Sequence, residues 1–272
     1  MTNDLHIPEY MNAVVTIGNG GYEKLLYQKV KTPIPSKNEV LVKVLAAGMN
    51  NTEINTRLGW YSPNIKVGTS RLNRKLENGD SINNAGWNGT TNFPLIQGTD
   101  CCGKIIKSGN SKNNSLIGKR VIIRSCMRVN GFKSRQKIWM ASNFDGAFAD
   151  YVKVPISEVF PINSNWSDAE LATIPCSYGT AENMLHIAEC CKDDTVLITG
   201  ASGGVGSALI QLAKLRGCKV IAIVNKLKFE SSIKIGADEV INRDDFLLDH
   251  LKENTISLVV DVVGGKNFTD FF

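Results

Sequence analysis

The sequence lacks the features that mark membrane, secreted and nucleic-acid-binding proteins. No apolar run approaches the ~18 residues that span a bilayer, and the opening MTNDLHIPEY has neither a basic nor an apolar stretch. The excess of positive charge is also small, because the sequence has 31 basic and 26 acidic residues and a net charge of only +5. We therefore expect a cytoplasmic protein with no membrane or nucleic-acid partner.

Residues spaced to bind a metal or to form disulfides are equally scarce. The three histidines lie at positions 6, 186 and 250, none in a ligand-like spacing. Seven cysteines are an odd number, and two adjacent pairs suit no disulfide framework, so we expect reduced thiols. Cys101 and Cys102 follow a strand-like apolar stretch, which favours core packing.

The first 155 residues contain short β-branched or alternating runs bounded by Gly, Asn, Ser or Pro, which predicts an irregular β-rich domain. The runs are 40–46, 103–106, 119–123 and 147–154, with a short helix expected at 52–58. Between 61 and 92 lies a polar stretch without hydrophobic period. Such a segment is either a lid over a substrate site or a surface excursion.

From Ser167 onward, helical and strand-like patterns alternate. Ser167 and Glu170 have the spacing of a capping box. The expected helices are 179–190, 205–215 and 229–235, and the expected strands are 195–199, 219–224, 239–242 and 257–263. Alternation with short connections predicts βαβ units and a parallel sheet, hence an α/β fold.

A glycine-rich turn joins the first of these strands to the helix that follows it. The residues are Ala201, Ser202, Gly203, Gly204, Val205 and Gly206. In this context Gly203 lets the backbone approach a pyrophosphate and Gly206 lets the helix pack closely on the strand. The N–H groups of the first helical turn then receive the negative charge. The turn predicts a nicotinamide dinucleotide site; the alternative is a turn without a ligand.

The end of the second strand bears on the choice of dinucleotide. NADH sites usually have an acidic residue there, whereas this sequence has Asn225 followed by Lys226 and Lys228. A lysine would pair with the 2′-phosphate of NADPH, so NADPH is favoured over NADH. The alternative is that both lysines are solvated surface charges.

Eight segments in order resemble the medium-chain dehydrogenase/reductase superfamily, specifically its zinc-independent, quinone-oxidoreductase-like branch. They are AAGMNNTEINTRLGWY, FPLIQGTDCCGKIIKSG, GKRVII, DGAFADYVKVP, ATIPCSYGTAENML, TGASGGVGSALIQLAK, GADEVINR and VVDVVGG. The resemblance implies a GroES-like domain over residues 1–155, a Rossmann domain with a doubly wound parallel sheet over 156–272, and an active site in the cleft between them.

The resemblance also locates the positions of the family's metal ligands. Zinc-dependent members have a Cys where this sequence has Asn50, and a His-Glu pair where it has Thr99 and Asp100. Only Cys176 stands where a third zinc ligand is often found. One thiol with an amide and a hydroxyl is a poor zinc site. The structural zinc lobe needs four cysteines, and residues 118–145 contain only Cys126. We expect no zinc.

Without a metal, hydride addition to a quinone or an activated C=C bond is less demanding than alcohol oxidation. Similarity to the branch places Asn50 and Thr180 near the nicotinamide, and Arg57 could polarise a substrate carbonyl or serve a structural role. Asn55 stands where many relatives have Tyr, which leaves the proton donor open. The predicted function is NADPH-dependent reduction of a small quinone or α,β-unsaturated carbonyl.

The sequence stops soon after VVDVVGG, where relatives are expected to continue into further Rossmann strands. We therefore expect a C-terminally truncated chain. The family's homodimer contact is doubtful for such a chain, and turnover is uncertain. Two alternatives remain: a zinc-type alcohol dehydrogenase and a nucleotide-binding protein without turnover.

Overall fold

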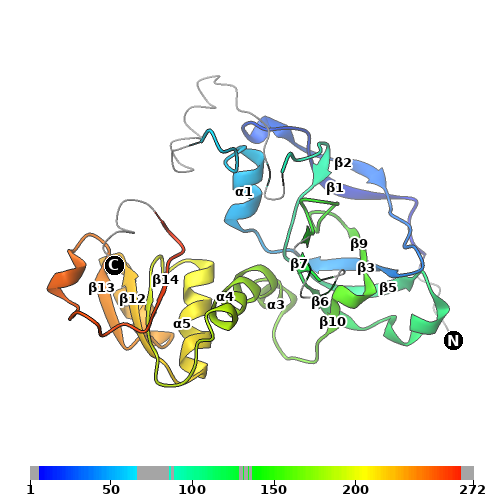
Figure 1. The fold of residues 1–272 in the computed structure, drawn as a ribbon. Helices are drawn as coiled ribbons and strands as arrows, with labels where there is room; N and C mark the ends of the chain where they lie inside the picture. Colours follow the sequence, from blue (N-terminus) through cyan, green and yellow to red (C-terminus); the bar gives the residue numbers. More distant parts are fainter. Residues whose placement is uncertain are drawn as a thin grey trace. The chain divides into compact units, whose positions relative to one another are not determined.

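The computed structural model describes residues 6–65, 86, 89–128, 131, 134 and 137–264. The chain forms two compact units, Met1–Cys176 and Ser177–Phe272 (Figure 1). The first is built on antiparallel sheets and the second on a parallel sheet with helices, which confirms the predicted α/β class with a β-rich N-terminal part. The domain boundary after residue 155 stays a prediction. Most of the 61–92 segment lies outside the described residues.

The main sheet of the first unit has five strands in the order β10-β6-β5-β3-β9, each antiparallel to its neighbours. Alternate apolar side chains, among them Val40, Val42 and Ile105, point into one core. The predictions for 40–46, 103–106 and 119–123 are confirmed. The bounds are β3 Glu39–Ala46, β5 Cys102–Ser108, β6 Arg120–Ile123, β9 Tyr151–Pro155 and β10 Val159–Pro161.

The strand predicted at 147–154 begins only at Tyr151. The preceding residues are engaged elsewhere, since Ala147 N–H donates to Gly98 O at 2.9 Å and Phe148 N–H donates to Gln97 O at 2.8 Å. These bonds draw the segment away from β3. Side-chain alternation could not reveal this, because it does not identify a strand's partner.

The rest of the first unit consists of smaller sheets and short helices. A three-stranded sheet has the order β2-β1-β4, and β7 pairs with β8. Their bounds are β1 Tyr10–Thr16, β2 Leu25–Lys31, β4 Leu95–Ile96, β7 Cys126–Met127 and β8 Ile138–Trp139. The helices are α1 Asn51–Arg57, α3 Asp168–Leu171 and the 3-10 helices Tyr22–Lys24, Ser111–Leu116 and Ile156–Glu158.

Helix α3 begins directly after the predicted cap Ser167, and α1 begins one residue before the predicted 52–58 helix. At α3, Glu170 N–H donates to Ser167 Oγ at 3.2 Å and Ser167 N–H donates to Glu170 Oε2 at 2.8 Å, which confirms the capping box. Helix α1 begins with a second capping box, between Asn50 and Glu53. These reciprocal bonds satisfy N–H groups that a helix start would otherwise leave unpaired.

The second unit contains a four-stranded parallel sheet in the order β13-β12-β11-β14 (Figure 1). This is the 3-2-1-4 order of a dinucleotide-binding fold. The strands are β11 Thr195–Ile198, β12 Lys219–Val224, β13 Glu239–Asn242 and β14 Leu258–Val260. The helices are α4 Pro175–Ile187, whose first two residues belong to the first unit, α5 Gly204–Leu215, α6 Phe229–Lys234 and the 3-10 helices Lys226–Lys228 and Leu247–Asp249.

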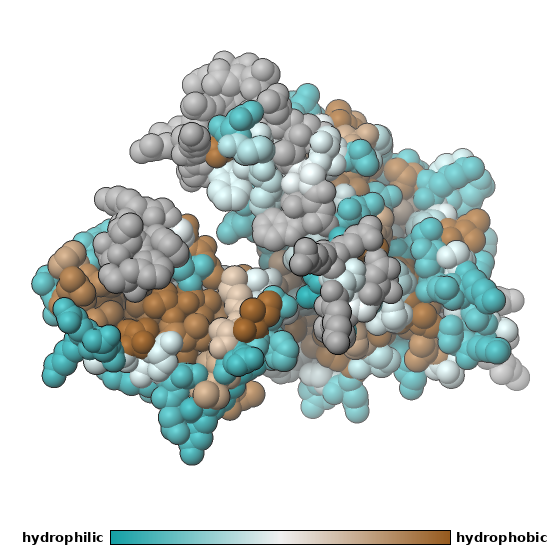
Figure 2. Space-filling model, viewed as in Figure 1, coloured by the Kyte–Doolittle hydropathy of each residue, from teal (hydrophilic) through white to brown (hydrophobic). Residues whose placement is uncertain are grey.

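Apolar side chains cover both faces of this sheet. On β11, Val196 and Ile198 pack into the core that contains α5, whereas Leu197 packs with Ile221 and Ile241 into a second core. Burial on both faces explains why the strands are continuous apolar runs. Hydrophobic surface also remains on the face of this unit shown in Figure 2.

Candidate functional site

The glycine-rich turn follows β11, and the residue just before the turn has a left-handed backbone conformation. Gly200 has φ +56°, and a Cβ there would lie 2.8 Å from a methyl group of Val263. Gly203 N–H donates to Gly200 O at 3.0 Å, which closes the turn. Glycine at 200 is therefore required by both conformation and space.

The turn leads into α5 with Gly203 as its N-cap, and no side chain caps the helix. The N–H groups of the first helical turn are therefore available to an anion. Ser202, Gly203 and Gly204 are exposed, whereas Ala201 and Gly206 are buried. A Cβ on Gly206 would lie 2.5 Å from Ala201 Cα, so the helix packs against the turn only because glycine is there. These residues fit a pyrophosphate.

The segment that leads into the turn is tied to the strand beside it. Thr199 Oγ1 donates to Asp261, which directly follows β14, and Val262 N–H donates to Thr199 Oγ1 at 3.0 Å. Partial burial acts to raise the pKa of Asp261, but bonds from Thr199, Gly264 and Val263 outweigh it and leave the pKa lowered. The ionised Asp261 thus holds the carboxyl ends of β11 and β14 together.

The residues at the end of β12 are arranged as a short polar turn. Asn225 caps the 3-10 helix, its Oδ1 accepting from Leu227 N–H at 3.0 Å. Lys226 and Lys228 are exposed, and neither forms an ion pair within the described ranges. Their ammonium groups are available to a ligand anion.

Sequence reasoning missed a third cation at this edge. Arg243 follows β13, and its N–H donates to Val224 O at 2.9 Å, which places it beside the end of β12. Its guanidinium is 3.9 Å from Asp244 and mostly exposed. The order of the strands could have identified Arg243 as a third cation, because the carboxyl ends of adjacent parallel strands lie at the same edge of the sheet.

Thr180 lies on α4, which begins four residues earlier than predicted, with Pro175 as its first residue. A Cβ on Gly204 would lie 2.8 Å from Ser177 Oγ, so this side of α4 contacts the start of α5. Thr180 is one turn along from Ser177 and is half-buried. It therefore belongs to the same neighbourhood as the glycine-rich turn.

In the first unit, the positions identified by family resemblance form one hydrogen-bonded cluster. Asn50 Nδ2 donates to Asp100 Oδ2 at 2.8 Å and to Thr99 Oγ1 at 3.2 Å. Cys176 N–H donates to Asp100 Oδ1 at 2.6 Å. The predicted neighbours thus meet, and Asp100 joins the start of α1 to the start of α4.

Glu53 completes the cluster from α1 and was not identified from the sequence. Its Oε1 accepts from the Thr99 N–H at 2.8 Å and hydroxyl at 2.7 Å, and its Oε2 accepts from Asn50 N–H at 2.7 Å. Glu53 is 5% exposed and Asp100 is 1% exposed. Two buried carboxyl groups within one network make this cluster a candidate site.

Burial changes the acidity of these groups. It raises the pKa of Asp100 to about 6, although the bonds from Asn50 and Cys176 act in the opposite direction. Burial, followed by the charges of Asp100 and Glu53, raises the pKa of the Cys176 thiol to about 12. The thiol is therefore protonated near neutral pH.

Arg57 lies at the end of α1 with its guanidinium buried within the first unit. Nη1 donates to Gly20 O, and the guanidinium lies 4.8 Å from the centre of the Tyr22 ring. These contacts join α1 to the β1–β2 connection. Nearby, Tyr61 Oη donates to Thr52 Oγ1 at 3.1 Å, and burial raises its pKa. The sequence analysis did not identify Tyr61 as a candidate site residue.

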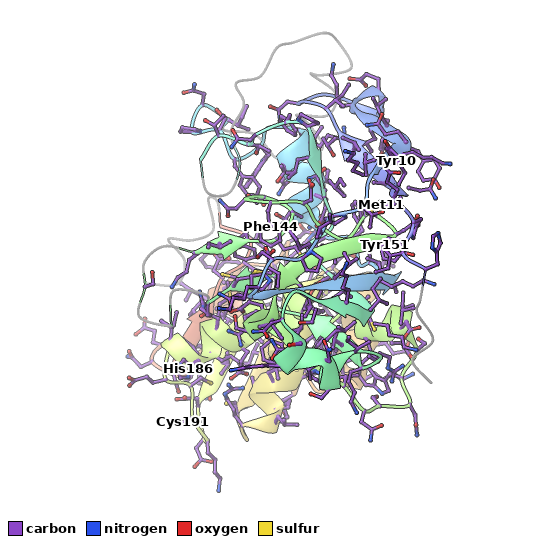
Figure 3. All side chains as sticks on the ribbon, turned by 90° about the vertical axis from the view of Figure 1, so that its right-hand side faces the viewer. Tyr10, Met11, Phe144, Tyr151, His186 and Cys191 are labelled. Carbon is purple, nitrogen blue, oxygen red and sulfur yellow. The ribbon has the colours of Figure 1, made fainter. Side chains whose placement is uncertain are left out.

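A groove of about 530 Å³ lies on the first unit, with Met11, Phe144 and Tyr151 among its lining residues (Figure 3). None of the predicted site residues lines it. Among the described residues, no three or more His, Cys, Asp or Glu side chains are arranged to hold a metal ion. Within the same ranges, no helix is long and apolar enough to cross a membrane.

Comparison with known proteins supplies the family. Residues 36–164 match the alcohol dehydrogenase GroES-like domain, and residues 204–272 match the zinc-binding dehydrogenase model. The crystal structure of a candidate alcohol dehydrogenase from Sinorhizobium meliloti is similar to this chain, with 36% sequence identity and a TM-score of 0.84. The match covers 100% of this chain and 74% of that protein. The chain belongs to the medium-chain dehydrogenase/reductase superfamily. It is a quinone-oxidoreductase-like member.

Two further relatives of this dehydrogenase/reductase are informative. Acryloyl-coenzyme A reductase of Metallosphaera sedula is 27% identical over 96% of this chain and 72% of its own length. The quinone oxidoreductase structure from Coxiella burnetii is 29% identical, with 94% of this chain and 69% of that chain covered and a TM-score of 0.71. The GroES-like and Rossmann-like architecture is thus confirmed, and this dehydrogenase/reductase is an NAD(P)-dependent oxidoreductase.

Proposed function

We propose that this oxidoreductase transfers a hydride from NADPH to a quinone or an α,β-unsaturated carbonyl compound without a catalytic metal. The observation that carries the proposal is the Asn50–Thr99–Asp100 network at the family's metal-ligand positions. The amide hydrogens of Asn50 bind Asp100 and Thr99, so the residues at these positions offer one amide, one hydroxyl and one thiol. This donor set does not fit zinc.

NADPH is favoured by the charge at the end of β12. Lys226 and Lys228 are exposed cations where an NADH site would normally have a carboxylate. Arg243 adds a third cation beside them. When bound, the dinucleotide supplies the hydride, and the protein orients it through the first-turn N–H groups of α5.

The substrate class is supported by the two relatives. The name of the Metallosphaera sedula enzyme specifies an acryloyl thioester, which is an α,β-unsaturated carbonyl, and the Coxiella burnetii protein is a quinone oxidoreductase. We propose that Asn50 and Thr180 contact the nicotinamide end of the cofactor. The contacts of Arg57 support a structural role in positioning α1 rather than contact with substrate.

The test measures binding and turnover separately. The full chain is titrated with NADPH and with NADH by nicotinamide fluorescence, and NADPH oxidation is then followed with a quinone and with an enoyl thioester. We expect tighter binding of NADPH and turnover with at least one acceptor. Tight binding without turnover would contradict the reductase proposal and favour a nucleotide-binding protein. Stoichiometric zinc in active preparations would favour an alcohol dehydrogenase.

A further inference from the structure

Three cysteines lie near the amino-terminal end of the parallel sheet in the second unit. Cys190 and Cys191 occupy the loop between α4 and β11, and Cys218 directly precedes β12. Figure 3 labels Cys191 in this loop. The Sγ atoms of Cys190 and Cys218 are 3.4 Å apart, and Cys218 Sγ donates to Cys191 O at 3.2 Å.

The two loops that carry these thiols are fixed side by side. Lys219 N–H donates to Asp194 O at 2.8 Å, and a Cβ on Gly217 would lie 3.2 Å from Lys192 Cγ. Since a disulfide bond is about 2.05 Å long, the Cys190 and Cys218 sulfurs need to approach by roughly 1.4 Å. A change of side-chain torsion at one or both cysteines has to supply that movement.

We propose that Cys190 and Cys218 are a modification site at which a hydroperoxide oxidises two thiols to a disulfide. Cys190 is partly exposed, whereas Cys218 is only 1% exposed, so the peroxide reaches Cys190 first. Attack by the Cys190 sulfur breaks the O–O bond, gives a sulfenic acid and releases water or an alcohol. The Cys218 sulfur then attacks the sulfenic sulfur, the S–S bond forms, and a water molecule leaves.

The surroundings of Cys190 set the pace of this reaction. Burial, followed by the neighbouring Cys218 thiol and Asp194, raises the pKa of Cys190, while Arg216 acts against this. The reactive thiolate is therefore scarce near neutral pH. We therefore expect the pair to need sustained exposure to peroxide before it oxidises.

The disulfide would enclose residues 190–218, which contain β11, the glycine-rich turn and α5. Closing this loop removes conformations from the unfolded chain and stabilises the second unit. The two sulfurs lie at the amino-terminal ends of β11 and β12, whereas the glycine-rich turn follows the carboxyl end of β11. Oxidation should therefore raise stability and leave the affinity for dinucleotide within about twofold.

The experiment treats the full chain with hydrogen peroxide, denatures it and alkylates the remaining thiols. Of the seven cysteines, the reduced protein should carry seven labels, and the oxidised protein should lose the two on Cys190 and Cys218. Peptide mapping should find a Cys190–Cys218 crosslink that dithiothreitol removes. Calorimetry should show the unfolding transition of the second unit raised by about 5 °C or more.

Two variants make the result decisive. Cys191→Ser removes the exposed neighbouring thiol and should still form the crosslink, whereas Cys190→Ser should not. A crosslink that persists in Cys190→Ser would overturn the proposal. So would oxidation of Cys190 to a sulfinic acid with Cys218 still alkylated, or no crosslink under conditions that fully oxidise Cys191. None of these readouts depends on the proposed reductase activity.

Discussion

Individual residues decide what the cluster in the first unit can do. Asn50, Thr99 and Cys176 stand at family ligand positions, but their polar groups bind one another, Asp100 and Glu53. The Asn50 amide and the Thr99 hydroxyl therefore both have hydrogen-bond partners inside the network. The sequence located four of these five residues. Glu53 was missed because only the fold brings α1 against residues 99–100.

The first prediction concerns the pH dependence of stability through Asp100. Its folded pKa is raised from 3.8 to about 6, so the folded state binds the proton more tightly. The contribution of Asp100 to the free energy of unfolding is therefore greatest below about pH 4. It falls by on the order of 3 kcal/mol as the pH rises to about 6 or 7. The Asp100→Asn variant should not show this loss of stability between about pH 4 and pH 7.

Tryptophan fluorescence measures this directly, because all four tryptophans lie in the first unit. Denaturant unfolding at pH 4.5 and at pH 7.5, two conditions chosen to bracket the transition, gives the change for each protein. Asp244→Asn, at an exposed carboxylate of the second unit, is the matched control and should behave like the unmodified chain. An unchanged pH dependence in Asp100→Asn would contradict the assignment.

The second prediction concerns cofactor choice at Lys228. Lys228→Glu should weaken NADPH binding by at least about tenfold, since a charge-assisted contact of roughly 1.5–3 kcal/mol is replaced by repulsion. Binding of NADH should change little. Lys192→Glu makes the same change of charge before β11, at the other end of the sheet, and serves as the control. Equal losses for both dinucleotides in Lys228→Glu would refute the role of this lysine.

At the scale of elements, the second unit follows local pattern closely. Strands β12 and β13 have the predicted bounds, and α5 begins one residue before its prediction. Short apolar runs between capped helices define a parallel sheet without long-range information. In contrast, the strand predicted at 257–263 spans only Leu258–Val260, because Asp261 turns the chain to bind Thr199 and Gly264.

Helix α4 shows what local pattern missed. It begins at Pro175 rather than near Gly179. Proline suits the first position of a helix, where no N–H donor is needed. The helical pattern indicated a start near Gly179, but Asp100 accepts from Cys176 N–H and supports the earlier start from outside the helix. That contact is tertiary, and the sequence pattern does not contain it.

The third prediction tests the close packing of α5 on its turn. Gly206→Ala would place a methyl group 2.5 Å from Ala201 Cα and should destabilise the second unit by about 1–3 kcal/mol. NADPH binding should weaken with it. Gly179→Ala is the matched control, because its Cβ meets nothing within 4 Å and alanine favours a helix by roughly 0.5–1 kcal/mol. Similar stability of the two variants would contradict the proposed packing.

At the scale of the whole molecule, the two units have separate tasks in the proposal. The first carries the polar network with Asn50 and Asp100, and the second carries the dinucleotide turn. NADPH should therefore stabilise the second unit, by about 2.7 kcal/mol at one hundred times its dissociation constant. Calorimetry with NADPH and then NADH measures this. A larger shift with NADH at equal concentration would contradict the cofactor assignment.

The central claim is hydride transfer from NADPH without a catalytic metal. It is tested most directly by NADPH oxidation with a quinone acceptor, before and after the protein is stripped of metal by a strong chelator. We predict the same rate in both samples and no increase on addition of zinc. Loss of turnover on chelation, restored by stoichiometric zinc, would contradict the claim.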